Sequence, residues 1–147
     1  MANDYGLKTT FYETDNKELI ALFTPRACHQ SYPRITHGGI TAAILDEAIG
    51  RAIMIHSDSA TFGVTIELTI TYKKPVPYDC RLKALCRITS NRGRIFEGTG
   101  ELYLPDGTIA ATARGRYLKR TLGQITDESF TDEQWFAVDD HPEEIDI

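Results

Sequence analysis

The longest helical pattern in the chain runs from Gly39 to about His56, where apolar residues fall on nearly every face of the expected helix. The apolar positions are Ile40, Ala43, Ile44, Leu45, Ala48, Ile49, Ala52 and Ile53. A helix on the surface of a domain shows a polar half, and this segment barely has one. We therefore expect one long helix that is surrounded by other elements.

After this helix, the period of the apolar residues changes from that of a helix to that of a strand. Apolar and polar residues alternate from Val64 to Tyr72, which predicts a strand with one apolar face. Three further strands are expected at Arg81–Thr89, Arg94–Leu104 and Thr108–Leu118. The last three are consecutive, which predicts a long meander.

Tight-turn sequences, Asn91-Arg92-Gly93 and Pro105-Asp106-Gly107, join the last three expected strands. Connections this short make neighbouring strands antiparallel. Gly98 and Gly100 lie inside one of these strands and indicate a bend or a close approach by another backbone.

Two shorter strands are expected before the helix, at Leu7–Thr14 and Leu19–Phe23, on either side of the turn pair Asp15-Asn16. A loop from Thr24 to Thr36 then leads to the helix. One long apolar helix followed by an antiparallel meander predicts a sheet wrapped around a helix, which belongs to the α+β fold class.

The charge of the 147-residue chain, -5 in total, is unevenly distributed. All 16 basic residues lie at or before Arg120, and nine of the 21 acidic residues lie at or after Asp127. Sixteen bases against the remaining twelve acids give the part before Asp127 a charge of +4. We expect a single domain over residues 1–122 and an acidic tail over residues 123–147, in which a short segment around Trp135-Phe136 docks on the domain.

Several classes of protein are excluded by composition and motifs. No apolar run approaches the roughly 18–20 residues of a spanning helix, and the N-terminal residues do not resemble a secretory signal. Cys28, Cys80 and Cys86 show no CxxC spacing, which disfavours disulfides and structural zinc and favours a reducing, cytoplasmic compartment. Cys28-His29 reads as a packed cysteine beside a surface histidine. Since no spanning run is present, a membrane is not expected as a partner. Nucleic acid is not expected either, because the basic residues are not interleaved with exposed aromatic residues.

The start of the long helix carries the strongest candidate for chemistry. The motifs of serine hydrolases, Walker-type and dinucleotide-binding proteins and zinc proteases are absent, which leaves His37-Gly38-Gly39 and the helix that follows. Helix N-termini present unpaired N–H groups, and Gly39, lacking a Cβ, would let a substrate carbonyl approach its N–H. Alternatively, the two glycines only permit the loop to turn.

Asp46 is the second candidate on this helix. Glu47 has Arg51 one turn later and reads as an ordinary surface pair. No such partner exists on the helix face of Asp46, which holds Ala42, Ala43, Ile49 and Gly50. An unpaired carboxylate on a stripe of small residues is costly unless it faces a cavity or a polar group, where it is a candidate general base or nucleophile. The stripe can equally well face water.

His37-Gly38-Gly39 with Asp46 nine positions after the histidine resembles the hotdog-fold acyl-CoA thioesterases of the phenylacetyl-CoA (PaaI-like) type. The resemblance covers roughly Cys28 to Arg120. It includes the segments Pro33–His37, Thr65–Pro77, Asn91–Arg94 and Ala113–Lys119. The combination of the glycine pair, the aspartate and the strand that ends in Tyr72-Lys73-Lys74-Pro75 is fairly specific.

The resemblance implies an antiparallel sheet wrapped around a central helix, with two subunits pairing into one continuous sheet. It implies a homodimer, assembled into a homotetramer, with active sites at the subunit interface and no metal or prosthetic group. The Gly39 N–H would polarise the thioester carbonyl, and Asp46 would attack it or activate a water. Thr65 matches a family Ser/Thr that orients the water.

The resemblance also implies where coenzyme A lies. Tyr72, the turn Asn91-Arg92-Gly93-Arg94 and Arg120 would follow its path, and arginines and turn N–H groups suit its phosphates. Taken singly, each arginine can also be a solvated surface charge. Some relatives place an Asn or Gln shortly before the histidine, where this chain has Gln30 and Ser31, and Gln30 could reach the carbonyl.

Two further residue sets have two interpretations each. His37, next to Gly38, either binds substrate or fixes the loop. Four apolar residues either line an acyl pocket or belong to the core: Ile40, Ile44, Ile53 and Met54.

The expected function is hydrolysis of an acyl-CoA thioester to a carboxylic acid and coenzyme A. The alternative is a non-catalytic acyl-CoA-binding hotdog protein that serves as a sensor or assembly module. A hotdog hydratase is a weaker third option, because the D-x-N-x-x-H-type loop that it would need is absent.

Overall fold

The structure is a computed structural model that describes residues 3–57 and 60–126. The acidic residues from Asp127 onward lie outside these ranges, as does the segment around Trp135-Phe136 that was expected to dock on the domain.

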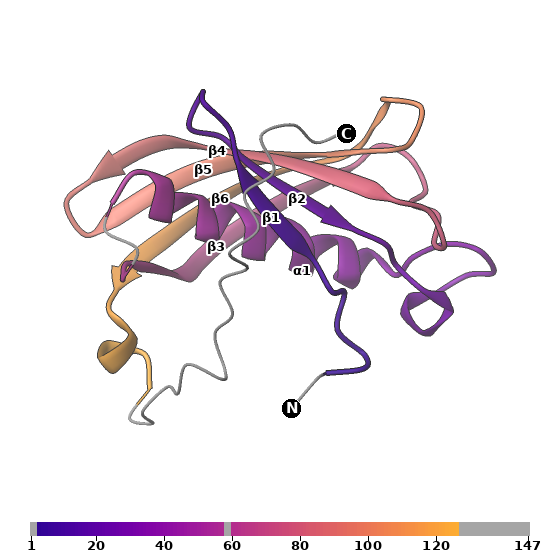
Figure 1. Cartoon of the computed structure of the whole chain (residues 1–147), viewed down its shortest axis with the longest axis horizontal. Coiled ribbons are helices and arrows are strands. Elements are labelled where there is room, and N and C mark those ends of the chain that lie inside the picture. The colour runs from indigo at the N-terminus through magenta and orange to yellow at the C-terminus, as the bar shows by residue number, and fades with distance from the viewer. Residues whose placement is uncertain (1–2, 58–59, 127–147) are drawn as a thin grey trace.

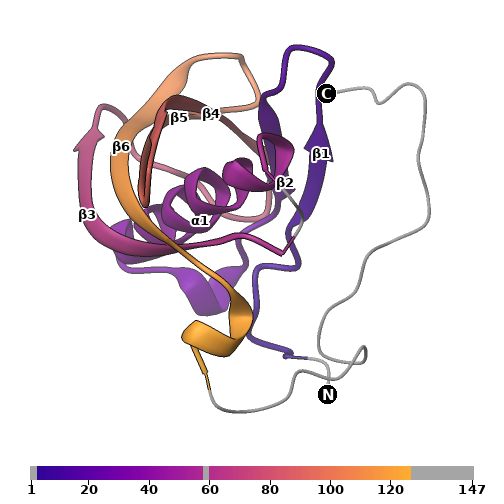
Figure 2. The same cartoon turned by 90° about the vertical axis from the view of Figure 1, so that its left-hand side faces the viewer.

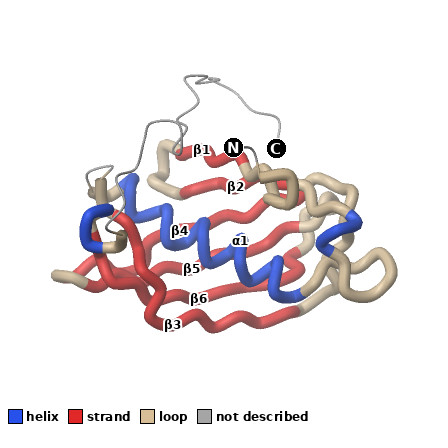
Figure 3. The backbone as a smooth tube through the Cα atoms, turned by 90° about the horizontal axis from the view of Figure 1, so that it is seen from below, coloured by secondary structure: helices blue, strands red, loops and turns tan. Residues whose placement is uncertain are grey.

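Six strands form one antiparallel sheet in the order β1-β2-β4-β5-β6-β3. The strands are β1 (Thr10–Glu13), β2 (Leu19–Phe23), β3 (Phe62–Tyr72), β4 (Leu82–Arg92), β5 (Ile95–Tyr103) and β6 (Ile109–Arg120). The sheet curves around one helix, α1 (Gly38–Arg51), as Figures 1 and 2 show. Seen from the helix side, α1 lies along the concave face of the sheet (Figure 3). The predicted α+β hotdog arrangement is therefore confirmed.

All six expected strands are present, and all except Leu19–Phe23 have different boundaries. The first strand was expected at Leu7–Thr14 and covers only Thr10–Glu13. β4 continues to Arg92, and its hairpin with β5 turns at Gly93, whose φ of +56° lies in the left-handed region that favours glycine. Gly107, in the next hairpin, has a φ of +80° for the same reason.

α1 packs on the sheet through residues at helical spacing, and Leu45 and Ile49 are fully buried. The close approach expected at the strand glycines is confirmed. A Cβ on Gly98 would lie 2.6 Å from the Ile49 Cγ2, and a Cβ on Gly100 would lie 3.2 Å from the Leu45 Cδ2. The two glycines therefore allow the helix to pack closely against β5.

The helix differs from the expectation in length and in surroundings. It ends at Arg51 and continues as a tighter 3₁₀ turn over Ala52–Ile55, and shorter 3₁₀ turns lie at Ala27–His29 and Leu122–Gln124. Ala43 is exposed, because the sheet covers only one side of the helix. Over the described ranges, no helix is long and apolar enough to span a membrane.

The predicted single apolar face of β3 is wrong for its first half. The pairing of β3 with β6 shifts its register immediately after Thr65. Thr65 pairs with Tyr117 and Leu68 pairs with Gly115, so both face the concave side, while Val64 lies on the opposite face and is 40% exposed. An alternating pattern cannot reveal such a β-bulge, because the extra residue changes which face each later side chain takes.

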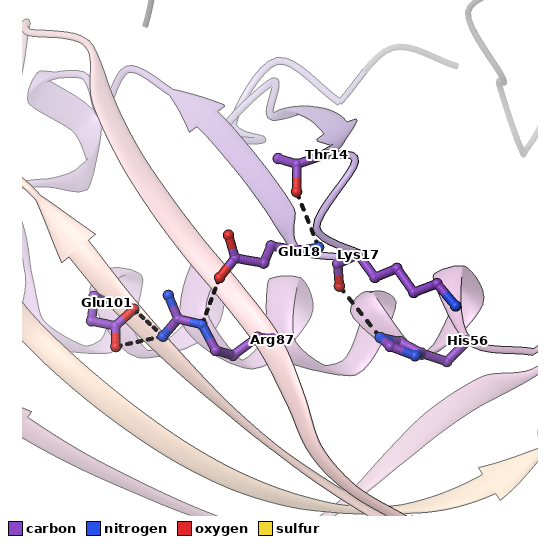
Figure 4. A network of polar contacts seen from close by, with 6 residues as sticks. All are labelled: Thr14, Lys17, Glu18, His56, Arg87 and Glu101. Atoms are coloured by element: carbon purple, nitrogen blue, oxygen red, sulfur yellow. Dashed lines mark hydrogen bonds and ion pairs between the residues drawn. The ribbon is translucent and has the colours of Figure 1, made fainter.

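Polar contacts fasten the β1–β2 hairpin to the rest of the domain (Figure 4). The Arg87 side chain on β4 donates from Nε to Glu18 at 2.8 Å and from Nη1 to Glu101 at 2.8 Å. Beyond the end of α1, the His56 Nε2 lies 3.3 Å from the carbonyl oxygen of Lys17. Arg87 on β4 thus links the start of β2 with β5.

The interpretation of Cys28-His29 is reversed by the structure. Cys28 is exposed, and His29 is 6% exposed. The His29 Nδ1 accepts from the backbone N–H of Arg26 at 3.0 Å, and its Nε2 lies 2.9 Å from the carbonyl oxygen of Tyr5. The histidine is buried because both ring nitrogens have backbone partners.

Candidate active site

Two hydroxyl groups hold the carboxylate of Asp46. Thr65 donates from Oγ1, which lies 3.0 Å from Oδ1 and 3.1 Å from Oδ2 of Asp46. The Tyr117 hydroxyl donates to Oδ1 at 3.0 Å. The helix face of Asp46 offers no partner, as its sequence indicated, and both partners come from the sheet. Asp46 is half-buried.

The two hydroxyl groups belong to directly opposed residues of β3 and β6. Thr65 and Tyr117 are register partners, and the bulge immediately after Thr65 lets both Thr65 and Leu68 face the helix. Sequence reasoning did not single out Tyr117. Alternation along the expected strand Thr108–Leu118 could have placed it on the helix side, but no spacing signal links it to Asp46, 71 residues earlier.

The ring of Tyr117 is enclosed. Its exposed fraction is 1%, and it stacks on Phe96 with ring centroids 5.0 Å apart and planes at 12°. A Cβ on Gly115 would lie 2.4 Å from this ring, and a Cβ on Gly50 would lie 3.3 Å from it. Burial raises the pKa of the Tyr117 phenol, and the nearby Asp46 carboxylate raises it further. The hydroxyl therefore stays protonated and remains a donor.

A cleft of about 180 Å³ adjoins Asp46, between the end of α1 and the start of β3. Thr65 and Asp46 are on its wall, together with the ion pair of Glu47 and Arg51 and with Gly50, Met54, Phe62 and Gly63. Of the four apolar residues considered for an acyl pocket, Met54 lines this cleft. Ile44 and Ile53 belong to the core, with exposed fractions of 2% and 0%. Among the described residues, no group of three or more His, Cys, Asp or Glu side chains could hold a metal ion.

The start of α1 is capped by the His37 side chain. Its Nδ1 accepts from the Gly39 N–H at 2.8 Å, so the N–H expected to polarise a substrate is occupied in this conformation. The Tyr72 hydroxyl donates to the Gly38 carbonyl at 2.7 Å. The Gly38 N–H has no acceptor among the residues that the structure describes. The His37 contact fits the second of its two interpretations, because it fixes the loop where the helix starts.

The structure does not bring the helix start and Asp46 together within one chain. Asp46 comes seven positions after Gly39, which is about 10 Å along a helix axis. Tyr72 lies beside the helix start, and Thr65 lies beside Asp46. One chain therefore presents two half-sites, one at the start of its central helix and one just past the middle of that helix.

The residues expected along coenzyme A are likewise divided. Tyr72 is at the end of β3 that pairs with Ala111, whereas Arg120 pairs with Phe62 at the other end. Ten strand residues span about 33 Å. Gln30 is exposed, in the loop before α1, and forms an isolated bridge with Thr36.

A group of cations, which we call the cationic end, surrounds the hairpin of β4 and β5. It consists of Arg92, Arg94, Lys119 and Arg120; Asn91 and Gly93 belong to the same hairpin. The Lys119 Nζ donates to the Gly93 carbonyl at 2.9 Å. No member has an acidic partner within 3–57 and 60–126. By contrast, Arg87, Arg114 and Arg116 on the sheet each pair with a glutamate. The cationic end therefore gathers, around one hairpin, four cations without an ion pair to any described residue, which suits an anionic ligand.

Curated relatives align with only part of their own length. An uncharacterized protein of Schizosaccharomyces pombe is 29% identical over 113 residues, which are 74% of this chain and 64% of that protein. The acyl-coenzyme A thioesterase THEM4 of Mus musculus is 36% identical over 67 residues, 46% of this chain and 27% of THEM4. The chain thus spans less than two thirds of either relative.

Solved structures share the fold. A Bacillus halodurans protein crystallised with CoA superposes with a TM-score of 0.69 at 24% identity, over 78% of this chain and 75% of that protein. The model of the family described as "Thioesterase superfamily" matches residues 34–111, more than half of the chain. Taken with the hotdog arrangement of sheet and helix, this match shows that the chain belongs to the thioesterase superfamily.

Proposed function

We propose that the protein hydrolyses an acyl-CoA thioester to a carboxylic acid and coenzyme A, without a metal or prosthetic group. The observation that carries the proposal is the Asp46 carboxylate, which two hydroxyl groups orient beside a cleft and which has no cationic partner among the described residues. Membership of the superfamily supports it, as do the name of THEM4 and the CoA crystallised with the Bacillus halodurans protein.

Asp46 can act in either of two ways. Its carboxylate attacks the thioester carbonyl and expels the CoA thiolate, leaving a mixed anhydride that water hydrolyses. Alternatively, it removes a proton from a water, which attacks the carbonyl directly. Thr65 donates its only hydroxyl hydrogen to Asp46, so its oxygen can accept from that water and orient it.

The developing oxyanion is stabilised at the start of α1. The Gly39 N–H can serve once the His37 ring turns aside, whereas the Gly38 N–H needs no rearrangement. Both N–H groups belong to the first turn of the helix, where the partial positive charge of the macrodipole adds to the hydrogen bonds. His37 and Gly38 thereby belong to the substrate-binding region, near Tyr72.

Two chains together supply one complete site in this proposal. β3 is an edge strand with only β6 beside it, and Val64, Ile66 and Tyr72 on it are 40%, 51% and 52% exposed. Antiparallel pairing of two β3 strands would place the helix start of one chain near Asp46 of the other. It would also bring Tyr72 toward the other chain's cationic end, so we propose a homodimer, further assembled into a homotetramer.

Hydrolysis of a panel of acyl- and aryl-CoA esters tests the activity. The Asp46→Asn variant is expected to lose at least about 100-fold in kcat, because it removes the group that attacks or accepts the proton. Asp106→Asn, in an exposed turn, is the matched control and should be as active as the wild type. A wild type that binds the esters and hydrolyses none would instead support the non-catalytic acyl-CoA-binding alternative.

Mixing two inactive variants tests the two-chain site. Gly38→Pro removes the Gly38 N–H at the first helical position, where proline is well tolerated, and His37 already has the extended backbone that proline requires before it. Co-refolding this variant with Asp46→Asn should restore about a quarter of the wild-type rate, since random pairing leaves that share of sites intact. Full activity of Gly38→Pro alone would assign the oxyanion contact to the Gly39 N–H.

A further inference from the structure

We propose that Tyr117 is a positioning residue for the reaction, which selects Oδ2 of Asp46 as the reacting oxygen. The proposal rests on the proposed function, and it adds a residue from β6 that influences the reaction without contacting the substrate. Tyr117 does so through Asp46.

The two oxygens of the Asp46 carboxylate are unequally engaged. Oδ1 accepts from Tyr117 and from Thr65, each at 3.0 Å. Oδ2 accepts only from Thr65, at 3.1 Å, and the single hydrogen of that hydroxyl is shared with Oδ1. More lone-pair density therefore remains on Oδ2, which is the oxygen left for attack or for proton removal.

The position of the Tyr117 hydroxyl is determined by rigid surroundings. The ring lies between the helix and the sheet, where Gly50 and Gly115 leave room for it and Phe96 stacks on its face. A tyrosine ring has only two rotatable side-chain bonds, so little freedom is left at the hydroxyl. The carbonyl oxygen of Asp46 lies 3.3 Å from the same hydroxyl, farther than Oδ1 at 3.0 Å, so the single hydrogen of Tyr117 is donated mainly to the carboxylate.

Both donors also act from one structural unit. Tyr117 and Thr65 are opposed across β3 and β6, so the distance between their hydroxyl groups is set by the sheet and not by loops. Functional groups on rigid elements hold a reacting group more precisely than groups on loops do. Burial keeps the phenol protonated, so it donates throughout the neutral pH range.

Tyr117→Phe separates this role from packing, because phenylalanine keeps the ring and removes only the hydroxyl. With an acyl-CoA ester that the wild type hydrolyses, kcat should fall about 10- to 100-fold, as expected for a lost hydrogen bond to a charged group, while KM changes little. Tyr103→Phe, on the opposite face of the sheet near Lys83, is the matched control and should leave both constants unchanged.

A double-mutant cycle with Asp46→Asn tests whether Tyr117 acts through Asp46. In that background, Tyr117→Phe should cause no further loss of rate, and the two changes should be non-additive in urea unfolding, which needs no activity. Wild-type kcat in Tyr117→Phe, or an equal loss in both backgrounds, would overturn the inference and leave the proposed function intact. A wild type without hydrolytic activity would remove both.

Discussion

At the residue scale, two buried side chains that can ionise, Tyr117 and Cys86, lie between the helix and the sheet. Tyr117 donates to Asp46 and stacks on Phe96. Cys86 is fully buried, and a Cβ on Gly100 would lie 2.8 Å from its Sγ. Burial raises the pKa of Cys86 to about 12, with Glu101 adding to the shift and Arg87 opposing it. Both groups are therefore held in their protonated forms by the fold.

These two side chains predict a loss of stability at alkaline pH. In the unfolded chain the pKa is the ordinary one, 9.0 for Cys86 and 10.0 for Tyr117. Well below pH 9, both side chains are therefore protonated in the folded and in the unfolded state. As the pH rises further, the unfolded chain releases protons that the folded chain retains. The free energy of unfolding should then fall by about 1.4 kcal/mol per pH unit for each group.

Urea unfolding of the wild type between about pH 8 and pH 11 measures this effect. Tyr117→Phe and Cys86→Ala each lack one of the two groups, so each should show a shallower pH dependence than the wild type. An unchanged slope in both variants would contradict the assignment.

At the element scale, β3 and β6 form the pair on which the site depends, and the bulge in β3 sets its geometry. Without the extra residue, Thr65 and Leu68 would face opposite sides of the sheet, because side chains alternate along a strand. The other edge of the sheet depends on Arg87, which joins the start of β2 to β4 and β5 through Glu18 and Glu101.

Replacing this arginine should destabilise the domain. Arg87→Met keeps the aliphatic stem and removes the guanidinium, leaving two glutamates that are 25% and 21% exposed without their cation. We expect a loss of about 1–3 kcal/mol in the free energy of unfolding. Arg114→Met is the control, since Arg114 is 67% exposed and its loss should cost less than about 1 kcal/mol. Equal losses in the two variants would contradict a special role for Arg87.

At the scale of the whole molecule, the net charge of -5 combines a domain of +4 with nine acidic residues from Asp127 onward. The structure adds that the domain's cations are unequal. Arg87, Arg114 and Arg116 are neutralised by glutamates, whereas the cationic end has no acidic partner in the described part of the chain. Two of its members, Lys119 and Arg120, come just before Leu122–Gln124. The acidic residues therefore follow the region proposed for the CoA phosphates.

Deleting the residues after Gln124 should leave CoA affinity unchanged or increase it, because competing negative charge is removed. Binding of CoA at low and high salt measures this, and any increase should shrink as salt screens the charges. A full-length variant with the nine acids changed to Asn or Gln is the control for chain length. A large loss of affinity in a truncated protein that keeps its fold and oligomeric state would count against the prediction.

Much of the fold follows from local patterns. The apolar helix, the alternating strands and the glycine turns at Gly93 and Gly107 were predictable because each depends on neighbours a few residues apart. The boundaries shifted where tertiary contacts decided them, as at the 3₁₀ turn after Arg51. The prediction that other elements surround α1 on all sides was wrong for one chain, because a single sheet covers only one side of the helix.

The amino-acid sequence by itself determined the elements, the antiparallel pairing of strands joined by short turns, and the choice of Asp46 and the glycine pair as candidates for chemistry. Only the tertiary structure decided what Asp46 contacts, since Thr65 and Tyr117 are 19 and 71 residues away from it. Their meeting depends on one bulge and on the register of β3 against β6. A register is a property of two strands together, so no periodicity along one segment can contain it.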